Sequence, residues 1–483
     1  MHKINTNKKY SKKIYEILFL ILSFLFAVPS IIYLIKNKTV YRFIWMRTYL
    51  FRLPATQSEK LLNAILFFGI FSLLFLLYIF ILKKHRKMFK NKKQIFTVII
   101  IASLLFMIII PYTSSDVYSY IANGWSAAHY KENPYYVSIG QIADEMGFSD
   151  KMFNKVATCW RYETVVYGPL WTTICTILSS FSFGNIDVAL YIFKFANLLV
   201  HMVNCILIYK ITKKNFFVLL YGLNPFILFE ALANAHNDIF IILFILLAIY
   251  FAVKKKNIFV AVAFIAMATA VKYLAILILP FIVLYHVRNK EVKDRIKCCF
   301  VCGIEYIAIV AIFYVFYLKD LNVLAGLFVQ QAKYNRSIFF LLYYYLKDEH
   351  MNIVSTIQNI TFIAFAIYYV YVVIRLLLQK EMKFNEVIRK YHVIIMIFTF
   401  IVITNFNPWY IMWLFPTVFW LKGKSINTVI NVSYASQIGN ILGFALFSED
   451  EALGIPYFII MVALTAILST VKDKNNEKKR LKE

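Results

Sequence analysis

The sequence predicts an all-α polytopic membrane protein, and three observations carry that prediction. The chain has 483 residues, of which 61% are hydrophobic, and a mean hydropathy of +0.67, far above that of a soluble domain. Apolar runs long enough to cross a hydrocarbon core recur along its whole length. The net charge of +27 lies mainly in short loops between those runs. That is the positive-inside pattern, and it calls for no nucleic-acid partner.

The basic loops predict an orientation. The N-terminal tail and the loop around Lys83–Lys93 are expected in the cytoplasm, so two spans lie between them and the third ends outside. Continuing this alternation gives about 14 transmembrane helices, within a range of about 11 to 14, with both termini cytoplasmic in a plasma membrane. The predicted spans are 14–35, 61–82, 95–112, 186–209, 215–232, 239–253, 257–271, 273–287, 297–318, 352–374, 392–404, 408–422, 426–447 and 453–471.

Two segments do not fit this predicted topology easily. Residues 36–60 are rich in lysine and arginine yet fall outside, so we expect a basic amphipathic segment that contacts lipid phosphates. The apolar run 168–182 cannot cross without placing Lys210, Lys213 and Lys214 outside. We therefore predict a re-entrant or surface helix there.

Asp116 is the most informative single residue. It lies directly after the third span and opens the outer loop 113–166, within a turn of the predicted bilayer surface. A charge beside hydrocarbon is costly, and an ionisable residue there is a functional hypothesis by default. Such a carboxylate can act as a general base on a hydroxyl. The alternative is an interfacial aspartate that only caps a helix.

Other polar residues gather on the same predicted face. His236, Asn237 and Asp238 precede an apolar run and are candidates to bind a sugar hydroxyl, although Asp238 is also placed to cap the following helix. Lys272 separates two apolar halves and is a candidate to neutralise a lipid phosphate as a point charge. The alternative for Lys272 is snorkelling to the interface without a function.

Aromatic and basic residues complete the predicted substrate-binding set. Tyr135, Trp409 and Tyr410 offer flat apolar faces for sugar rings or lipid, Tyr167 belongs to the run Tyr167-Gly168-Pro169-Leu170, and Arg336 is an outer-loop cation that could stabilise a departing phosphate. For the aromatic residues, an interfacial aromatic belt is an equally good interpretation.

Several motifs of soluble enzymes are missing. The sequence has no Walker loop, Gly-rich dinucleotide turn, His-Glu-x-x-His helix or Gly-x-Ser-x-Gly elbow. Its six cysteines suggest neither a disulfide framework nor a metal site. If the chain is an enzyme, its activated substrate is expected to arrive through the membrane. No cofactor is assigned, and a divalent cation is left open.

Taken in order, these motifs resemble the GT-C superfamily of integral-membrane glycosyltransferases. The nearest resemblance is to the polyprenyl-phosphomannose-dependent α-mannosyltransferases of family 87 and the actinobacterial α-1,6-mannopyranosyltransferases, and it covers about residues 95–422. The matching residues are Asp116, Asn133-Pro134-Tyr135, Tyr167-Gly168-Pro169-Leu170, His236-Asn237-Asp238, Lys272, Pro280, Asn407-Pro408-Trp409-Tyr410, Trp413 and Pro416.

The resemblance implies a function. Asp116 matches the catalytic carboxylate of the first outer loop, and a hexose, with mannose the first choice, is expected to pass from a polyprenyl-phosphate sugar to an extracytoplasmic acceptor with inversion. The acceptor would be a glycan, a glycolipid or a cell-wall polymer. The superfamily often shows two acidic residues in this loop, whereas Asp116 stands alone between Ser115 and Val117. This departure leaves a metal-assisted mechanism open.

Two other function classes compete with the enzyme. A transporter or flippase for a lipid-linked saccharide shares the helix count and buried charges, but it predicts internal repeats and broken helices at the midplane. A structural subunit predicts no focused cluster of ionisable groups. We see no repeat, and the polar residues gather at one face, so the sequence favours one glycosyltransferase domain over residues 1–483.

Overall fold

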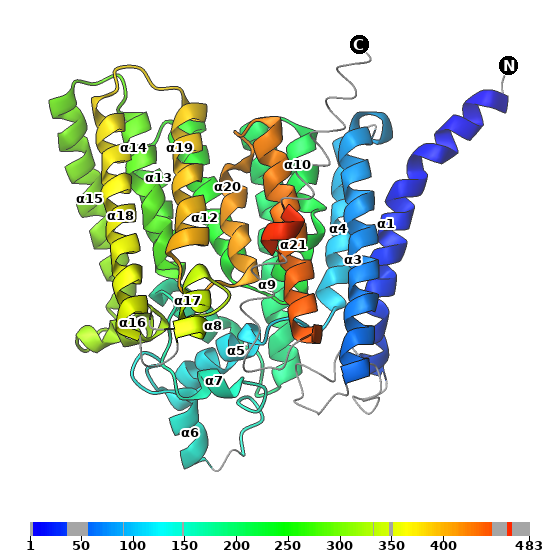
Figure 1. Cartoon of the computed structure of the whole chain (residues 1–483), viewed down its shortest axis with the longest axis horizontal. Coiled ribbons are helices and arrows are strands. Elements are labelled where there is room, and N and C mark those ends of the chain that lie inside the picture. The colour runs from blue at the N-terminus through cyan, green and yellow to red at the C-terminus, as the bar shows by residue number, and fades with distance from the viewer. Residues whose placement is uncertain are drawn as a thin grey trace. The chain divides into compact units, whose positions relative to one another are not determined.

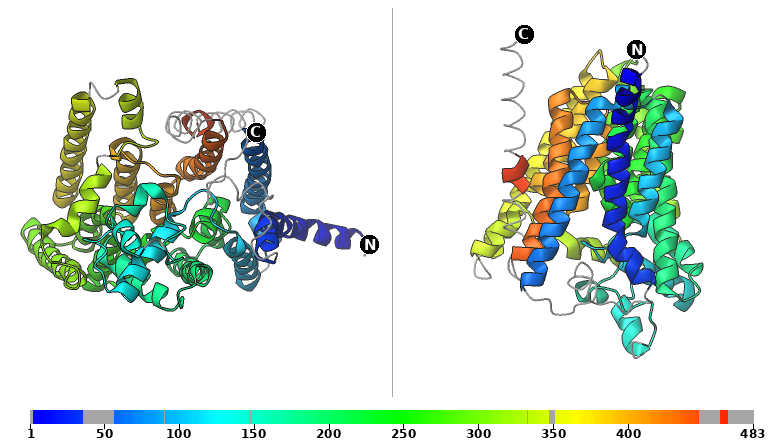
Figure 2. Two further views of the ribbon diagram at one scale, coloured as in Figure 1. Left: turned by 90° about the horizontal axis from the view of Figure 1, so that it is seen from below. Right: turned by 90° about the vertical axis from the view of Figure 1, so that its right-hand side faces the viewer.

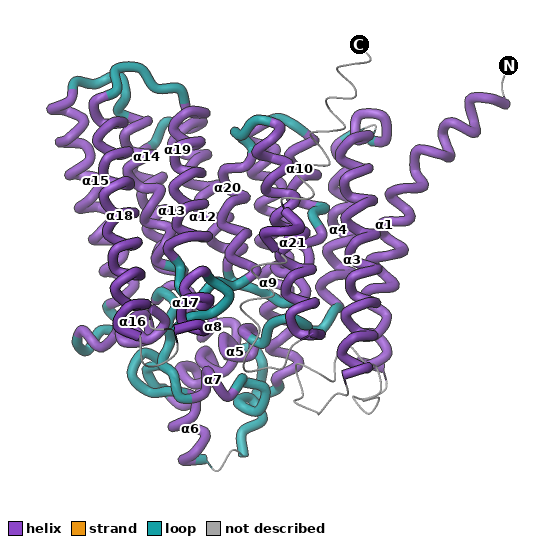
Figure 3. Tube along the Cα trace, viewed as in Figure 1, coloured by secondary structure: helices purple, strands orange, loops and turns teal. Residues whose placement is uncertain are grey.

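The computed structural model describes residues 3–35, 57–89, 91–146, 149–331, 333–346, 351–446 and 461–465. Within these ranges the chain is helical with connecting loops and forms no strand (Figure 3). The all-α prediction is therefore confirmed. The chain divides into two compact units, each assembled from segments that alternate along the sequence.

The first unit comprises residues 1–132, 139–163 and 174–239. Its elements are α1 (Lys3–Ile35), α3 (Gln57–Met88), α4 (Lys92–Ile108), α5 (Asp116–Trp125), the π-helix η1 (Ser126–Tyr130), α6 (Ile139–Glu145), α7 (Thr158–Arg161), α9 (Ile186–Thr212), α10 (Asn215–Gly222), α11 (Pro225–Leu228) and the π-helix η2 (Phe229–Ala233). Helices α8 (Pro169–Ser180) and α12 (Asp238–Ile249) contribute residues to both units.

Helices α1, α3 and α4 lie side by side in the first unit (Figures 1 and 2). Aromatic side chains fill the space between them and η2: the ring of Phe67 lies 5.4 Å from that of Phe26 and 5.3 Å from that of Phe229. The Tyr112 ring stacks on Phe67 at 5.6 Å. Edge-to-face and offset pairs of this kind add to the free energy of apolar burial. Through these ring contacts, η2 and the segment just before Asp116 both pack against α3.

The predicted span 215–232 is broken in the structure. Helices α10 and α11–η2 bend by 47° at Leu223–Asn224. The side chain of Asn224 accepts from the N–H of Phe226 at 3.0 Å, and Tyr78 donates its hydroxyl to the carbonyl of Leu220 at 2.7 Å. Broken helices persist at membrane depth only where such partners satisfy the freed backbone groups. The break turns the chain toward Glu230 and His236.

The second unit comprises residues 133–138, 164–173 and 240–483. Its elements are the π-helix η3 (Tyr250–Lys255), α13 (Ile258–Val271), the 3₁₀ helix η4 (Tyr273–Ile278), α14 (Leu279–His286), α15 (Val292–Tyr314), η5 (Leu321–Leu324), α16 (Ala325–Gln331), α17 (Ile338–Leu346), α18 (Met351–Leu378), α19 (Phe384–Ile397), the π-helix η7 (Phe398–Val402), the 3₁₀ helix η8 (Pro408–Leu414), α20 (Phe415–Val418) and α21 (Gly423–Leu446).

The turn at Gly168 packs directly on the end of α13. The Gly168 N–H donates to the carbonyl of Val271 at 3.1 Å, and a Cβ at Gly168 would lie 2.3 Å from the carbonyl oxygen of Ala270. Only glycine permits this approach of two backbones. The Tyr-Gly-Pro-Leu run thus positions Tyr167 beside Lys272, the residue that follows α13.

The predicted count of about 14 spans is not confirmed. Among the described residues, five helices are long and apolar enough to cross a membrane, and a sixth follows if the bent pair α10–α11 counts as one span. Most of the other predicted spans fall on helices that are shorter or interrupted, such as the 12-residue α12. The 12-residue α8, in the region where we expected a re-entrant or surface helix, is also too short for that test. Hydropathy identifies apolar runs, but it does not show where a helix within such a run ends or is interrupted.

Some predictions fall outside the described residues. Most of the basic segment 36–60 and most of the last predicted span, 453–471, lie there. Of the six cysteines, the five whose side chains are described are free.

Candidate active site

Asp116 is the first residue of α5. Its N–H donates to the Ser114 hydroxyl at 3.2 Å, and its side chain keeps 13% of its surface exposed. A carboxylate in the first turn of a helix is stabilised by the helix dipole, but the N-cap position of α5 belongs to Ser115 and not to Asp116. The remaining exposure leaves it accessible to a reacting hydroxyl.

Three ionisable side chains form a row that we call the carboxylate–histidine cluster: Asp116, His236 and Glu230. Nδ1 of His236 lies 3.8 Å from Oδ2 of Asp116, and Nε2 lies 3.3 Å from Oε2 of Glu230. His236 and Glu230 are fully buried. The structure therefore brings together Asp116 and His236, which the sequence placed 120 residues apart on the same predicted face.

The backbone that leads to His236 is irregular. Glu230 lies in the π-helix η2, a type of bulge often found at functional sites. The N–H of His236 donates to the Glu230 carbonyl at 3.0 Å, and Ala235 between them has a φ of 58°. A non-glycine residue in this left-handed region costs about 1–2 kcal/mol. Local strain of this kind concentrates where a side chain must be aimed.

Asn234 ties the cluster to the loop before Asp116. Its Nδ2 donates to Oε2 of Glu230 at 2.8 Å and to the Thr113 hydroxyl at 2.7 Å, and its Oδ1 accepts from the N–H of Tyr112 at 3.0 Å. One amide thus holds the two chain segments that carry Glu230 and Asp116. Buried networks of this kind are rigid when their members are satisfied.

From α9, Lys194 and Tyr191 secure the end of α4. The ammonium of Lys194, fully buried, donates to the carbonyls of Met107 and Ile109, and the hydroxyl of Tyr191 donates to that of Ile108 at 3.2 Å. Cations are favourable at a helix C-terminus, where carbonyls lack partners. These contacts fix the point at which the chain leaves α4 for Asp116.

Asn237 and Asp238 are also fully buried. Neither polar atom of the Asn237 amide has a hydrogen-bond partner among the described residues. Leaving a buried polar group unpaired costs about 1–3 kcal/mol, so this amide is suited to receive a ligand hydroxyl. Asp238 lies in the first turn of α12, where the helix dipole favours its charge.

In the second unit, Lys272 lies among aromatic rings. Its ammonium is 4.3 Å from the centre of the Tyr410 ring, 4.9 Å from that of Trp413 and 6.0 Å from that of Tyr167. Tyr410 and Trp413 stack at 4.2 Å because the 3₁₀ helix η8 places residues three apart directly above each other. Lys272 is thus held by cation–π contacts, and its position does not depend on snorkelling.

A second cation joins the same group. Nη1 of the buried Arg336 donates to Oδ1 of Asn407 at 3.2 Å, and Nδ2 of Asn407 donates to the Tyr410 hydroxyl at 3.3 Å. An isolated bridge between Asn335 and Asn405 aligns the two segments. We call Lys272, Tyr410, Trp413, Asn407 and Arg336 the aromatic–cation cluster. Two cations linked through one amide and one phenol are suited to an anionic group.

Two predicted aromatic contacts are mainly structural. Tyr135 is 2% exposed, and its hydroxyl is shared between the Tyr167 carbonyl at 2.8 Å and the Thr172 hydroxyl at 3.0 Å. Trp409 is 7% exposed and packs edge-on against Tyr410 at 6.1 Å. Their burial favours packing over sugar stacking.

The predicted loop 113–166 is largely folded into short helices and turns. Asp150 accepts hydrogen bonds from Nε1 of Trp125 and from the Tyr130 hydroxyl, both at 2.8 Å. Burial, together with this hydrogen bond and the charge of Asp150, raises the pKa of Tyr130 to about 12. The phenol therefore stays neutral and donates, and this carboxylate holds the segment together.

Sequence reasoning missed Glu230, Asn234 and Lys194. A signal was present for two of them, since Glu230 and Lys194 are charges inside predicted apolar spans, where ionisable residues are expensive. Asn234, two residues before His236, was expected among the polar residues of the outer face but was given no role in the site. Among the described residues, no group of three or more histidine, cysteine, aspartate or glutamate side chains could hold a metal ion.

Comparison with known families gives one match. The model described as alpha-(1->6)-mannopyranosyltransferase, N-terminal domain (the MptA_B family) matches residues 30–288, more than half of the chain. The chain therefore belongs to this mannosyltransferase family, and the resemblance drawn from the ordered motifs is confirmed. No curated protein and no solved structure matches. The match includes the carboxylate–histidine cluster and Lys272, whereas Arg336, Asn407 and Tyr410 lie beyond it.

Proposed function

We propose that this member of the alpha-(1->6)-mannopyranosyltransferase family transfers mannose from a polyprenyl-phosphate donor to a glycan, glycolipid or cell-wall acceptor on the extracytoplasmic side. The observation that carries the proposal is the contact of Asp116 with His236, and of His236 with Glu230. This arrangement offers one accessible carboxylate supported by two buried ionisable groups. A sugar on a lipid phosphate already has a good leaving group, so no nucleotide is required.

The proposed reaction is a single displacement with inversion. The acceptor oxygen attacks the anomeric carbon, and the bond from that carbon to the phosphate oxygen breaks. The lipid phosphate leaves with the electron pair of that bond. The acceptor proton passes to the carboxylate of Asp116, which acts as general base.

His236 and Glu230 complete the proton path. We assign the proton of His236 to Nε2, which lies 3.3 Å from Oε2 of Glu230, so that the lone pair of Nδ1 faces Asp116. Asp116 then passes its new proton to Nδ1. The imidazolium formed lies between two carboxylates, which stabilise its charge. The distance of 3.8 Å from Nδ1 to Asp116 is long for a hydrogen bond, and catalytic contacts often shorten only with substrate bound.

Lys272 and Arg336 serve the donor phosphate in this proposal. Negative charge grows on the phosphate as it departs, and fixed cations aimed at such charge are among the largest contributors to catalysis. The aromatic–cation cluster holds both cations in place, Arg336 through the amide of Asn407 and Lys272 over the rings of Tyr410 and Trp413.

A donor panel tests the substrate class. Purified full-length protein in detergent is given polyprenyl-phosphate mannose, polyprenyl-phosphate glucose or GDP-mannose, with a mannoside acceptor. We expect transfer from polyprenyl-phosphate mannose alone. Equal or faster transfer from GDP-mannose would contradict the proposed donor.

Glu230→Gln is expected to lower kcat about 10- to 100-fold with little change in the KM for donor, the loss typical of carboxylates that orient metal-bound histidines, because Glu230 lies against His236 in the same way. The matched control is Glu16→Gln, since Glu16 is also a buried carboxylate of the first unit but contacts Gln94 instead. Steady-state kinetics of both variants at equal amounts of folded protein check this. Equal losses in both would reduce Glu230 to a structural residue.

The orientation has its own test. In a background with all six cysteines replaced by alanine, a cysteine at the exposed Glu145 should react with an impermeant thiol reagent added to intact cells. A cysteine at the exposed Lys93 should react only after the cells are opened. The reverse pattern would place Asp116 in the cytoplasm and exclude the proposed side of the reaction.

A further inference from the structure

A basic pocket opens at the far end of the first unit from Asp116. It encloses about 930 Å³ between the C-terminal end of α3, the start of α4 and the start of α10. Helix α4 begins beside this pocket and ends near Asp116, so its 17 residues separate the two sites by about 25 Å at 1.5 Å per residue. The pocket is therefore distinct from the candidate active site.

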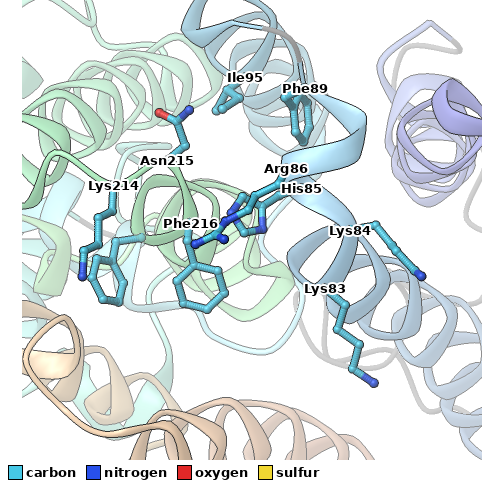
Figure 4. A pocket seen from close by; sticks show the side chains of 10 residues that line it. Lys83, Lys84, His85, Arg86, Phe89, Ile95, Lys214, Asn215 and Phe216 are labelled. Atoms are coloured by element: carbon cyan, nitrogen blue, oxygen red, sulfur yellow. The ribbon is translucent and has the colours of Figure 1, made fainter.

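The lining of this pocket is strongly positive. Lys83, Lys84, Arg86 and Lys214 contribute to it, all four exposed, and no carboxylate is among the described residues that line it. Figure 4 shows Arg86 and His85 reaching from α3 toward Phe216, with Lys214 and Asn215 approaching from the other side. Lys83 and Lys84 extend along α3 at the rim. Such a concentration of positive charge around a concave site attracts a phosphate or another anion.

The pocket walls are apolar between the charges. Phe216 packs against His85 with ring centres 5.5 Å apart, and the Lys214 ammonium lies 5.5 Å from the centre of the Phe217 ring. Ile95 closes the wall from α4. These contacts place His85 and Lys214 against apolar side chains. A ligand with both a phosphate and an apolar part fits this lining better than a free ion.

An exposed apolar stripe of α3 ends at Lys84, which lines the pocket. Leu73, Leu76 and Phe80 are 50%, 62% and 38% exposed, and with Lys84 they recur every three or four residues along one face. The apolar span of α3 ends at Arg86. An acyl chain that lies along this stripe brings its headgroup to the level of Lys84 and Arg86. Basic pockets between membrane helices are known binding sites for anionic headgroups.

We propose that the basic pocket binds the phosphate headgroup of an anionic phospholipid from the leaflet at the Lys92 end of α4. Arg86 would hold the phosphate with its planar fork, and Lys214 would add a point charge from the opposite wall. This site is independent of sugar transfer. Bound lipid would tie α3 to α10, the helix that precedes the break leading to Glu230.

Native mass spectrometry of the full-length protein in detergent tests the site. Short-chain phosphatidylglycerol is titrated against wild type and Arg86→Gln/Lys214→Gln, and phosphatidylcholine and inorganic phosphate are the comparison probes. We expect phosphatidylglycerol to bind more tightly than phosphatidylcholine. Each neutralised charge should weaken binding about fivefold, so the double variant loses about 25-fold.

Two further variants make the result decisive. Arg86→Lys/Lys214→Arg keeps both charges and should retain most of the affinity. Lys254→Gln/Lys255→Gln removes two exposed lysines of η3 and should leave phosphatidylglycerol binding unchanged. Equal losses in this control would show unspecific attraction and overturn the proposal. Equal affinity for phosphatidylcholine, or binding of inorganic phosphate without phosphatidylglycerol, would also overturn it.

Discussion

Replacement of Asp116 by asparagine is expected to lower the turnover of sugar transfer by about 10²–10⁴-fold, the usual range for general-base catalysis. Asparagine nearly conserves the volume and still forms hydrogen bonds at the start of α5, but it cannot accept the acceptor proton. Donor binding should persist, so kcat falls while the Kd for donor changes little. Single-turnover assays with pre-bound donor measure both quantities.

The matched control for this variant is Asp144→Asn. Asp144 is an exposed carboxylate of the same segment 113–166 and accepts a hydrogen bond from the Tyr162 hydroxyl at 3.1 Å. Its replacement should leave turnover near that of wild type. If Asp116→Asn transferred sugar at a near-normal rate, Asp116 would only stabilise the first turn of α5 and would have no role in catalysis.

The second large effect is expected at Lys272. Lys272→Ala should lower kcat/KM by about 10²–10³-fold, the usual loss when one fixed electrostatic stabiliser of a transition state is removed. Lys272→Arg should retain more activity, because it keeps the charge over the Tyr410 and Trp413 rings although the geometry changes. The measurement is transfer rate as a function of donor concentration.

Lys319→Ala provides the comparison for Lys272. The Lys319 ammonium also lies over a tyrosine ring, 5.3 Å from the centre of Tyr136, but outside the aromatic–cation cluster. This variant removes a lysine and a cation–π contact without touching the proposed phosphate site. A loss for Lys272→Ala no greater than that for Lys319→Ala would reject phosphate binding by Lys272.

The fold class was predictable because hydrophobic composition and the distribution of basic loops are properties of whole segments. Individual spans were less predictable. The turn from α10 into α11 depends on Asn224 and on the hydroxyl of Tyr78, which is 142 residues from the carbonyl it bonds. Hydropathy averages over such positions. For this reason the hydropathy of residues 215–232 indicates one span, whereas the structure has two helices and a π-helix there.

The candidate site was partly predictable for a related reason. Asp116 and His236 stood out because polar residues at the ends of apolar runs are conspicuous, and Lys272 stood out for the same reason. Glu230 and Lys194 lie inside apolar runs, and the mean hydropathy of those runs hides single charged residues. The contact of Lys272 with Trp413 depends on η8 being a 3₁₀ helix with three residues per turn, and the sequence pattern does not predict that helix type.

Covalent transfer of labelled mannose from polyprenyl-phosphate mannose, by purified protein in detergent, tests the central claim most directly. Detergent removes the two compartments that a transporter or flippase needs, so only an enzyme can turn over. We predict a mannosylated acceptor with inverted anomeric configuration from wild type, and almost none from Asp116→Asn. Absence of product from folded wild type, together with donor movement across liposomes that contain it, would contradict the account.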